Sequence, residues 1–142
     1  MSQIEVREYR PADQKEVVDL ILQIQQVEYH LPITIENQPD LLNIESFYQS
    51  RGEFWTAVFE NRVVGTVGII DIGDGNAVLR KMFVKKEFRG GDFGAAAKLL
   101  AQLQNWAVQN HFRTVYLGTT PQFLAAHRFY EKHGFIEIRE DE

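Results

Sequence analysis

The chain contains no cysteine, which excludes a disulfide, a thiol nucleophile and a cysteine-based metal site. It has no apolar run that approaches the length of a membrane-spanning helix. The first residues, Met1 to Val6, lack the basic region and apolar core that mark a signal peptide. From these absences we expect a cytoplasmic protein that does not associate with a membrane.

Positive charge is also in deficit, since 15 basic residues stand against 20 acidic ones and the net charge is −5. Such a balance argues against nucleic-acid and anionic-membrane binding and leaves cationic substrates open. The hydrophobic content of 44% and charged content of 25% are those of an ordinary globular protein. With 142 residues and no visible linker or repeat, we expect one domain over residues 1–142.

Three of the ten glycines lie in the segment Phe88–Ala95, between a strand pattern (Val78–Val84) and a long helical pattern. A glycine-rich turn into a helix N-terminus offers backbone N–H groups and a favourable dipole to a phosphate. Arg89 adds a guanidinium suited to phosphate oxygens. Basic residues crowd this stretch: Arg80, Lys81, Lys85, Lys86 and Arg89. These features favour a phosphate site, although a plain loop with a solvated basic face would show the same pattern.

Three better-known motifs do not fit this segment. No Gly-Lys-Ser/Thr follows, so it is not a P-loop, and the spacing is not the G-x-G-x-x-G of a dinucleotide site. Asp92-Phe93-Gly94 spells the metal-binding triplet of kinases, but the chain has no His-Arg-Asp.

Hydrophobic periodicity predicts the other elements. Helices are expected from residue 11 to 27, with Val27 on the buried face, over 41–49 and 121–133, and in a long helix ending at Asn110. In that long helix Phe93, Ala96, Leu100, Leu103 and Ala107 form the buried face, with Leu99 and Trp106 beside it. Residues 54–59 and 63–70 form a hairpin, 114–117 a buried strand, and 4–9, 78–84 and 135–139 further strands. This order implies an α/β sandwich around a mixed sheet.

A second motif lies near the C-terminus, where Phe129-Tyr130-Glu131-Lys132-His133-Gly134-Phe135 closes a helix onto a strand. Taken alone, Tyr130 is as well explained as a packing aromatic. Taken with Met82-Phe83-Val84, the basic loop and the Arg-Gly-rich turn, in this order and at this distance, the motif resembles the GNAT superfamily of acyl-CoA-dependent N-acetyltransferases. The resemblance covers nearly the whole chain. It implies a mixed, mostly antiparallel sheet with helices on both faces.

The resemblance also implies roles for individual residues. The pyrophosphate of acetyl-CoA, the co-substrate, would lie on the N–H groups of residues 90–95 with Arg89 beside it. The pantetheine arm would pair with Met82 and Val84 like an added strand. Tyr130 would protonate the departing thiolate, and no metal is involved. The implied cofactor-binding residues are Met82, Phe83, Val84, Arg89, Gly90, Gly91, Asp92, Phe93, Gly94 and Ala95.

The chain departs from the family pattern at two positions. Asp92 stands where the family has glycine. A carboxylate there would face the pyrophosphate at like charge or cap the helix, so either Asp92 points to solvent or CoA binds weakly or shifted. Phe123 stands where the family often has asparagine. A general base is needed because an amine is mostly protonated at neutral pH. The sequence assigns none among the candidates Glu28, His30, Glu36 and His127.

The function implied is transfer of an acetyl group to a primary amine of a small molecule, amino acid or peptide. Without a cysteine, direct attack in a ternary complex is favoured over an acyl-enzyme. The irregular segment Tyr29–Asp40 and the hairpin would select the acceptor. The alternative is a non-catalytic module of the same fold that binds acyl-CoA or a partner. No nucleic-acid partner is expected, and a homodimer is compatible with the resemblance.

Overall fold

A five-stranded sheet in the order β1-β2-β3-β4-β5 organises residues 3–90 and 93–117, the part of the chain that the computed structural model describes. The first four strands are antiparallel and β5 runs parallel to β4, which confirms the mixed, mostly antiparallel sheet. The strands are β1 (Glu5–Glu8), β2 (Gly52–Phe59), β3 (Arg62–Gly73), β4 (Asn76–Val84) and β5 (Thr114–Leu117).

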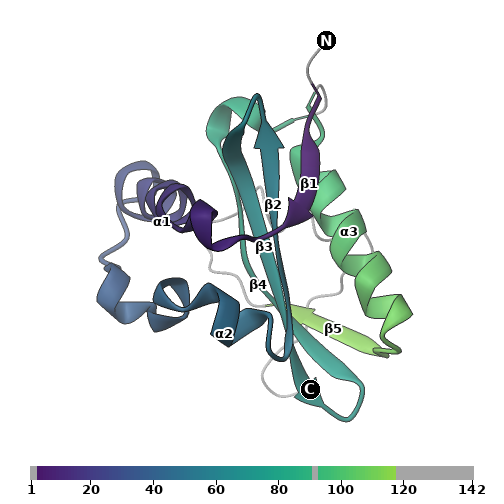
Figure 1. Cartoon of the computed structure of the whole chain (residues 1–142). Coiled ribbons are helices and arrows are strands. Elements are labelled where there is room, and N and C mark those ends of the chain that lie inside the picture. The colour runs from purple at the N-terminus through teal and green to yellow at the C-terminus, as the bar shows by residue number, and fades with distance from the viewer. Residues whose placement is uncertain (1–2, 91–92, 118–142) are drawn as a thin grey trace.

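Helices cover both faces of the sheet, as predicted: α1 (Gln14–Leu22) and α2 (Ile44–Tyr48) lie on one face and α3 (Ala95–Gln109) on the other (Figure 1). Short helical turns connect them: η1 (Pro11–Asp13), η2 (Gln23–Glu28), η3 (Ile35–Asn37), η4 (Pro39–Leu42) and η5 (Lys86–Phe88). Among the described residues no helix is both long and apolar enough to cross a membrane.

Two apolar cores result, one on each face. Trp55 packs toward α3 with Leu99 and Leu103, whereas the neighbouring Phe54 packs toward α1 and α2 with Tyr48. Adjacent residues of a strand point to opposite faces, so β2 supplies both cores. Each of these large side chains, when fully buried, stabilises the fold by about 1.5–3 kcal/mol.

The β2–β3 hairpin is confirmed, and Glu60 and Asn61 at its tip have φ of 49° and 67°. Two consecutive left-handed residues match the twist of the paired strands. The helix expected over residues 41–49 is shorter and follows the turn η4.

The first helix buries the face predicted for it except at its last position. Val17, Leu20, Ile21 and Ile24 are buried as expected, but Val27 is 57% exposed. The reason is η2, a π-helical segment that continues α1. A π-helical turn contains more residues than an α-helical one, so Val27, within this segment, no longer follows the spacing of α1.

Two further predictions need correction. α3 begins only at Ala95, and Phe93 precedes it with 37% of its surface exposed, while Leu99 is fully buried at the centre of the face. β5 is not a buried strand, because its residues alternate between exposed and partly buried. Its inward residues Val115 and Leu117 pack on the α3-side core. The elements predicted at 121–133 and 135–139 lie outside the described residues.

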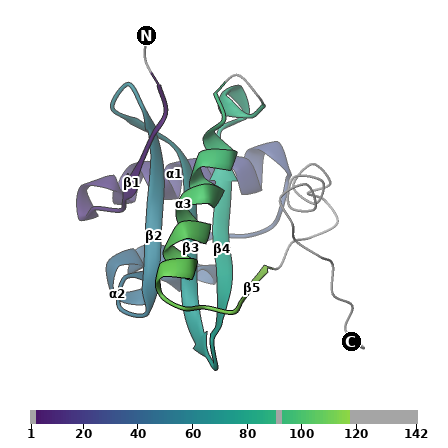
Figure 2. The ribbon, with the colours of Figure 1, turned by 90° about the vertical axis from the view of Figure 1, so that its right-hand side faces the viewer.

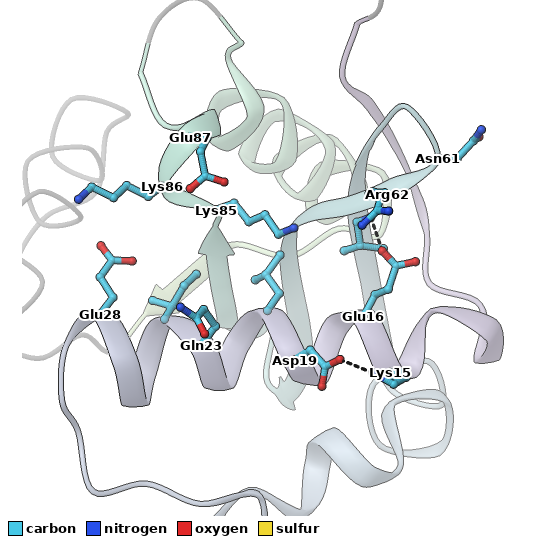
Figure 3. A pocket seen from close by; sticks show the side chains of 13 residues that line it. Lys15, Glu16, Asp19, Gln23, Glu28, Asn61, Arg62, Lys85, Lys86 and Glu87 are labelled. Carbon is cyan, nitrogen blue, oxygen red and sulfur yellow. Dashed lines mark hydrogen bonds and ion pairs between the residues drawn. The ribbon is translucent and has the colours of Figure 1, made fainter.

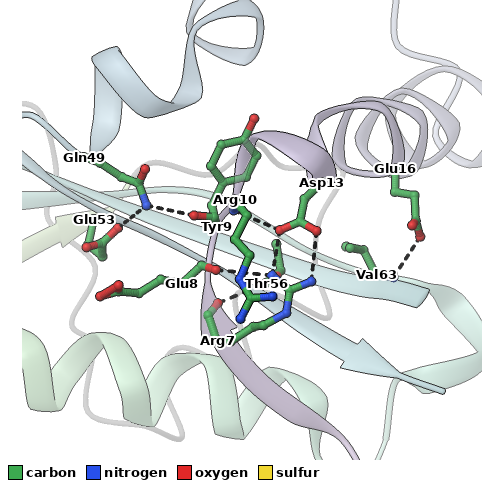
Figure 4. A network of polar contacts seen from close by, with 10 residues as sticks. All are labelled: Arg7, Glu8, Tyr9, Arg10, Asp13, Glu16, Gln49, Glu53, Thr56 and Val63. Carbon is green, nitrogen blue, oxygen red and sulfur yellow. Dashed lines mark hydrogen bonds and ion pairs between the residues drawn. The ribbon is translucent and has the colours of Figure 1, made fainter. Parts of the chain in front are cut away.

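An ion pair fixes β1 against the start of the first helix (Figure 4). The guanidinium of Arg7 donates to both carboxylate oxygens of Asp13, at 2.7 and 2.9 Å, and the backbone N–H of Arg10 donates to Asp13 at 3.0 Å. Burial acts to raise the pKa of the Asp13 carboxyl, but these hydrogen bonds outweigh it and the pKa is lowered. The ionised carboxylate of Asp13 therefore stabilises the folded state.

We expect Arg7→Ala to lower the free energy of unfolding by about 2–3 kcal/mol, because it leaves a buried carboxylate without its main partner. A carboxyl group whose pKa is lowered on folding stabilises the fold at pH values above its ordinary pKa of about 3.9. This stabilisation is lost as the pH falls through the lowered pKa. The difference between the variant and the wild type should thus shrink on acidification. Urea unfolding at neutral and acidic pH measures it. Arg10→Ala, which keeps the backbone donor, is the control; an equal loss there would refute this explanation.

Candidate functional site

The glycine-rich turn leads from β4 through η5 into α3. Of its described residues, Gly90 (φ 102°) and Gly94 (φ 64°) adopt left-handed conformations. An added Cβ would meet nothing within 4 Å at either position, so glycine is needed here for its conformation rather than for space. Gly94 is the N-cap of α3, and the first turn of that helix contains no acidic residue. This end of the helix can therefore accept an anion. Gly91 and Asp92 lie outside the described residues.

Aromatic packing holds the turn against the end of β2. The ring of Phe93 lies 4.8 Å from Phe88 and 5.5 Å from Phe59, measured between centroids, and Phe88 lies 5.1 Å from Phe59. Phe93, predicted as a helix core residue, instead anchors the turn.

Arg89 anchors the same turn from the other side. Its Nε donates to the Val84 carbonyl at 2.8 Å, and its two terminal nitrogens donate to the carboxylate of Glu28, at 2.7 Å for the Nη2–Oε1 pair. The hydrogen bond from Arg89 lowers the pKa of Glu28, which makes Glu28 a weaker proton acceptor than an ordinary glutamate. The Arg89–Glu28 ion pair thus links the turn to the end of η2, the segment that continues α1.

The described part of β5 pairs with the first half of β4 only, from Asn76↔Thr114 to Leu79↔Leu117 (Figure 2). Met82 and Val84 follow further along β4, on the way to the turn. A strand edge that no described strand covers can pair with an extended ligand through its backbone groups. The Val84 carbonyl already accepts from Arg89, but a carbonyl oxygen has two lone pairs.

The five basic residues of this stretch do not gather around the turn, contrary to the impression from the sequence. Arg80 and Lys81 lie near Asp40 on the α1–α2 face. Lys85 and Lys86 line a cavity beside α1. Arg89 alone borders the turn, paired with Glu28.

That cavity, of about 920 Å³, lies between α1, η2, the start of β3 and η5 (Figure 3). Two of its acidic groups have partners within the cavity: Asp19 accepts a hydrogen bond from Lys15 at 2.7 Å, and Glu16 accepts one from the backbone N–H of Val63 at 2.9 Å. Four basic and four acidic side chains line it, so its charge selects no ligand. They are Lys15, Arg62, Lys85 and Lys86, and Glu16, Asp19, Glu28 and Glu87.

Sequence reasoning missed a buried polar cluster on the α1–α2 face. Asp40, only 4% exposed, accepts a hydrogen bond from the Tyr48 hydroxyl at 2.5 Å. Burial and this hydrogen bond raise the pKa of Tyr48. The hydroxyl of Thr66 donates to the Lys81 carbonyl at 2.7 Å. Burial lowers the pKa of Lys81, against the attraction of Asp40. The only sequence signal was two successive cations within a strand.

Tyr130, the predicted catalytic residue, and Phe123 and His127 lie outside the described residues. Of the other base candidates, Glu28 is paired with Arg89, whereas His30 and Glu36 are exposed. The described residues bring Arg89, Gly90, Phe93, Gly94 and Ala95 together in one turn, next to the end of β4 that carries Met82, Phe83 and Val84.

Within the described residues, the second half of β4 has no strand on its β5 side and leads into an anion-accepting turn. This arrangement defines an α/β protein suited to a long, phosphate-bearing ligand. Comparison with known proteins specifies the family: the model described as "Acetyltransferase (GNAT) family" matches residues 18–135. The chain belongs to the GNAT acetyltransferase family. The resemblance found in the sequence is thereby confirmed.

Individual relatives agree with this assignment. An N-acetylaspartate synthetase of Xenopus tropicalis is 39% identical over 102 residues, 70% of this chain and 37% of that protein. Streptothricin acetyltransferase A of Bacillus subtilis (strain 168) is 35% identical over 77 residues, 54% of this chain and 43% of that protein. A GNAT acetyltransferase structure from Staphylococcus aureus Mu50 matches with a TM-score of 0.93 and 35% identity, over 97% of this chain and 86% of that one. The chain spans less than half the length of both curated relatives.

Proposed function

We propose that this chain transfers the acetyl group of acetyl-CoA to a primary amine of an amino acid or another small molecule. The observation that carries the proposal is that the part of β4 that no described strand covers on its β5 side leads into the turn of Gly90 and Gly94. Family membership and the names of the two curated relatives, both N-acetylating or acetylating enzymes of small molecules, support it.

The chain's residues would divide the work along this path. Backbone N–H groups at residues 90–95, with Arg89 beside them, would bind the pyrophosphate. Met82 and Val84 would hold the pantetheine arm through their backbone groups, with Phe83 between them. The thioester would then lie near the middle of β4.

The reaction proposed is direct. The amine nitrogen attacks the thioester carbonyl carbon, a C–N bond forms and the C–S bond breaks. The nitrogen gives up a proton to an acceptor still to be identified, and the sulfur leaves as a thiolate that Tyr130 protonates. The products are an N-acetylated amine and CoA.

Acetyl-CoA should raise the melting temperature of the protein, and Arg89→Ala should weaken its binding by about 10- to 100-fold, the effect of one charge-assisted phosphate contact. Arg89 also holds the turn, so Glu28→Gln is the matched control. It disturbs the same ion pair but keeps the cation, and should leave affinity unchanged or improved. Titration calorimetry and thermal shifts, with ATP and NAD as comparison ligands, measure this. An equal loss of acetyl-CoA affinity in both variants would mean that Arg89 only holds the turn in place. If acetyl-CoA does not shift the melting temperature at all, the assignment of acetyl-CoA as co-substrate is wrong.

A further inference from the structure

β4 contains one residue more than its partner strand at its middle. Thr66 pairs with Phe83 and Gly68 with Arg80, so that Val67 alone faces both Lys81 and Met82. Lys81 adopts a left-handed conformation at this bulge, with φ of 54°. The buried Thr66 hydroxyl fixes it by donating to the Lys81 carbonyl.

The bulge changes where two side chains point. In a regular strand, Arg80 and Lys81 would lie on opposite faces of the sheet. Here both reach the same carboxylate, with Arg80 Nη2 at 3.9 Å and Lys81 Nζ at 3.8 Å from Asp40 Oδ2. The extra residue therefore builds a pair of adjacent cations on the α1–α2 face.

Asp40 balances only one of these two charges. Its Oδ2 also accepts the Tyr48 hydroxyl, and neither cation lies within hydrogen-bond distance of it. Lys81 is mostly buried, whereas the side chain of Arg80 is 40% exposed and its guanidinium lies over the ring of Phe47. The cluster has one positive charge in excess, and Arg80 can present it to a ligand.

The cluster stands where the acceptor must bind, if the proposed function holds. With the pyrophosphate at residues 90–95 and the arm along Val84 and Met82, the chain of acetyl-CoA runs back along β4 toward Lys81 and Arg80. The thioester end thus points at the cationic pair. Asp40 belongs to η4, in the connection between α1 and α2, and lies beside Arg80 and Lys81.

We propose that the acceptor is an amine that also carries a carboxylate, as an amino acid does, and that Arg80 binds this carboxylate. Asp40, which lies near both Arg80 and Lys81, keeps the two cations side by side. An arginine fork matches a carboxylate in shape and charge. Polycationic amines would meet a like charge at this point. The inference rests on the proposed function and goes beyond it, because it requires a carboxylate on the acceptor and assigns its binding to Arg80.

The test compares matched acceptors: L-aspartate and L-glutamate, their dimethyl esters, and spermidine, with acetyl-CoA saturating and kcat/KM followed by CoA release and product mass. The free acids should be preferred over the esters. Arg80→Gln should raise KM for the acids by about 10- to 100-fold, as expected for a charge-assisted contact, and leave the esters and acetyl-CoA nearly unaffected. Arg80→Glu should reverse the order in favour of spermidine.

Arg51→Gln is the matched control, because Arg51 lies over the same Phe47 ring at 5.3 Å and is exposed. It should change none of these constants. Preference for esters or spermidine by the wild type, or equal effects of Arg80→Gln and Arg51→Gln, would overturn the inference while acetyl transfer stands. Acetyl-CoA binding with no acetylation of any amine would overturn the proposed function and this inference together.

Discussion

Tyr130→Phe should lower the turnover of acetyl transfer by about 10²–10⁴-fold while leaving the affinity for acetyl-CoA nearly unchanged. The variant removes one hydroxyl, the proton donor proposed for the departing thiolate, and keeps the ring. A thiol with a pKa of about 8.5 leaves tolerably without protonation, which favours the lower end of this range.

Steady-state kinetics with the best acceptor, together with the melting temperature, measure the effect. Tyr116→Phe removes the same atom from a partly exposed position on β5 and serves as the control. If Tyr130→Phe turns over like the wild type, or loses activity only in proportion to its stability, Tyr130 is a packing residue.

Asp40→Ala should lower the free energy of unfolding by about 2–4 kcal/mol. The change leaves the buried Tyr48 hydroxyl without its acceptor and Lys81 without a counter-charge. The cost stays below that of a tight buried ion pair, because the cations lie 3.8 and 3.9 Å from the carboxylate.

Urea unfolding measures this loss, and Asp19→Ala is the matched control. Asp19 also faces a lysine, at 2.7 Å, but on an exposed helix surface, where an ion pair contributes about 0–1 kcal/mol. Comparable losses for the two variants would mean that the Asp40 cluster adds no stability beyond that of a surface pair.

Much of the fold could be predicted because it is encoded locally. The apolar runs of β2 and β3, the polar residues between them and the glycines before α3 are all features of neighbouring residues. Val27 and Phe93 were misplaced because a π-helical turn and a late helix start shift the spacing, and periodicity alone does not reveal either.

The candidate site was only half predictable, for a similar reason. The turn and its glycines follow from a motif. The meeting of Asp40 with Arg80 and Lys81 depends on a bulge whose extra residue becomes visible only when β3 is paired with β4. Likewise, Glu28 and Arg89 are 61 positions apart in the sequence, and no local pattern joins them.

The most direct test of the central claim is the stoichiometry of acetyl transfer by the full chain. Acetyl-CoA is mixed with a panel of free amino acids, and CoA release, N-acetylated products and the mass of the protein are followed together. We predict one N-acetylated amino acid for each CoA released and no acetylated protein on the way. CoA release that never exceeds background hydrolysis, whichever amine is present, would contradict the account.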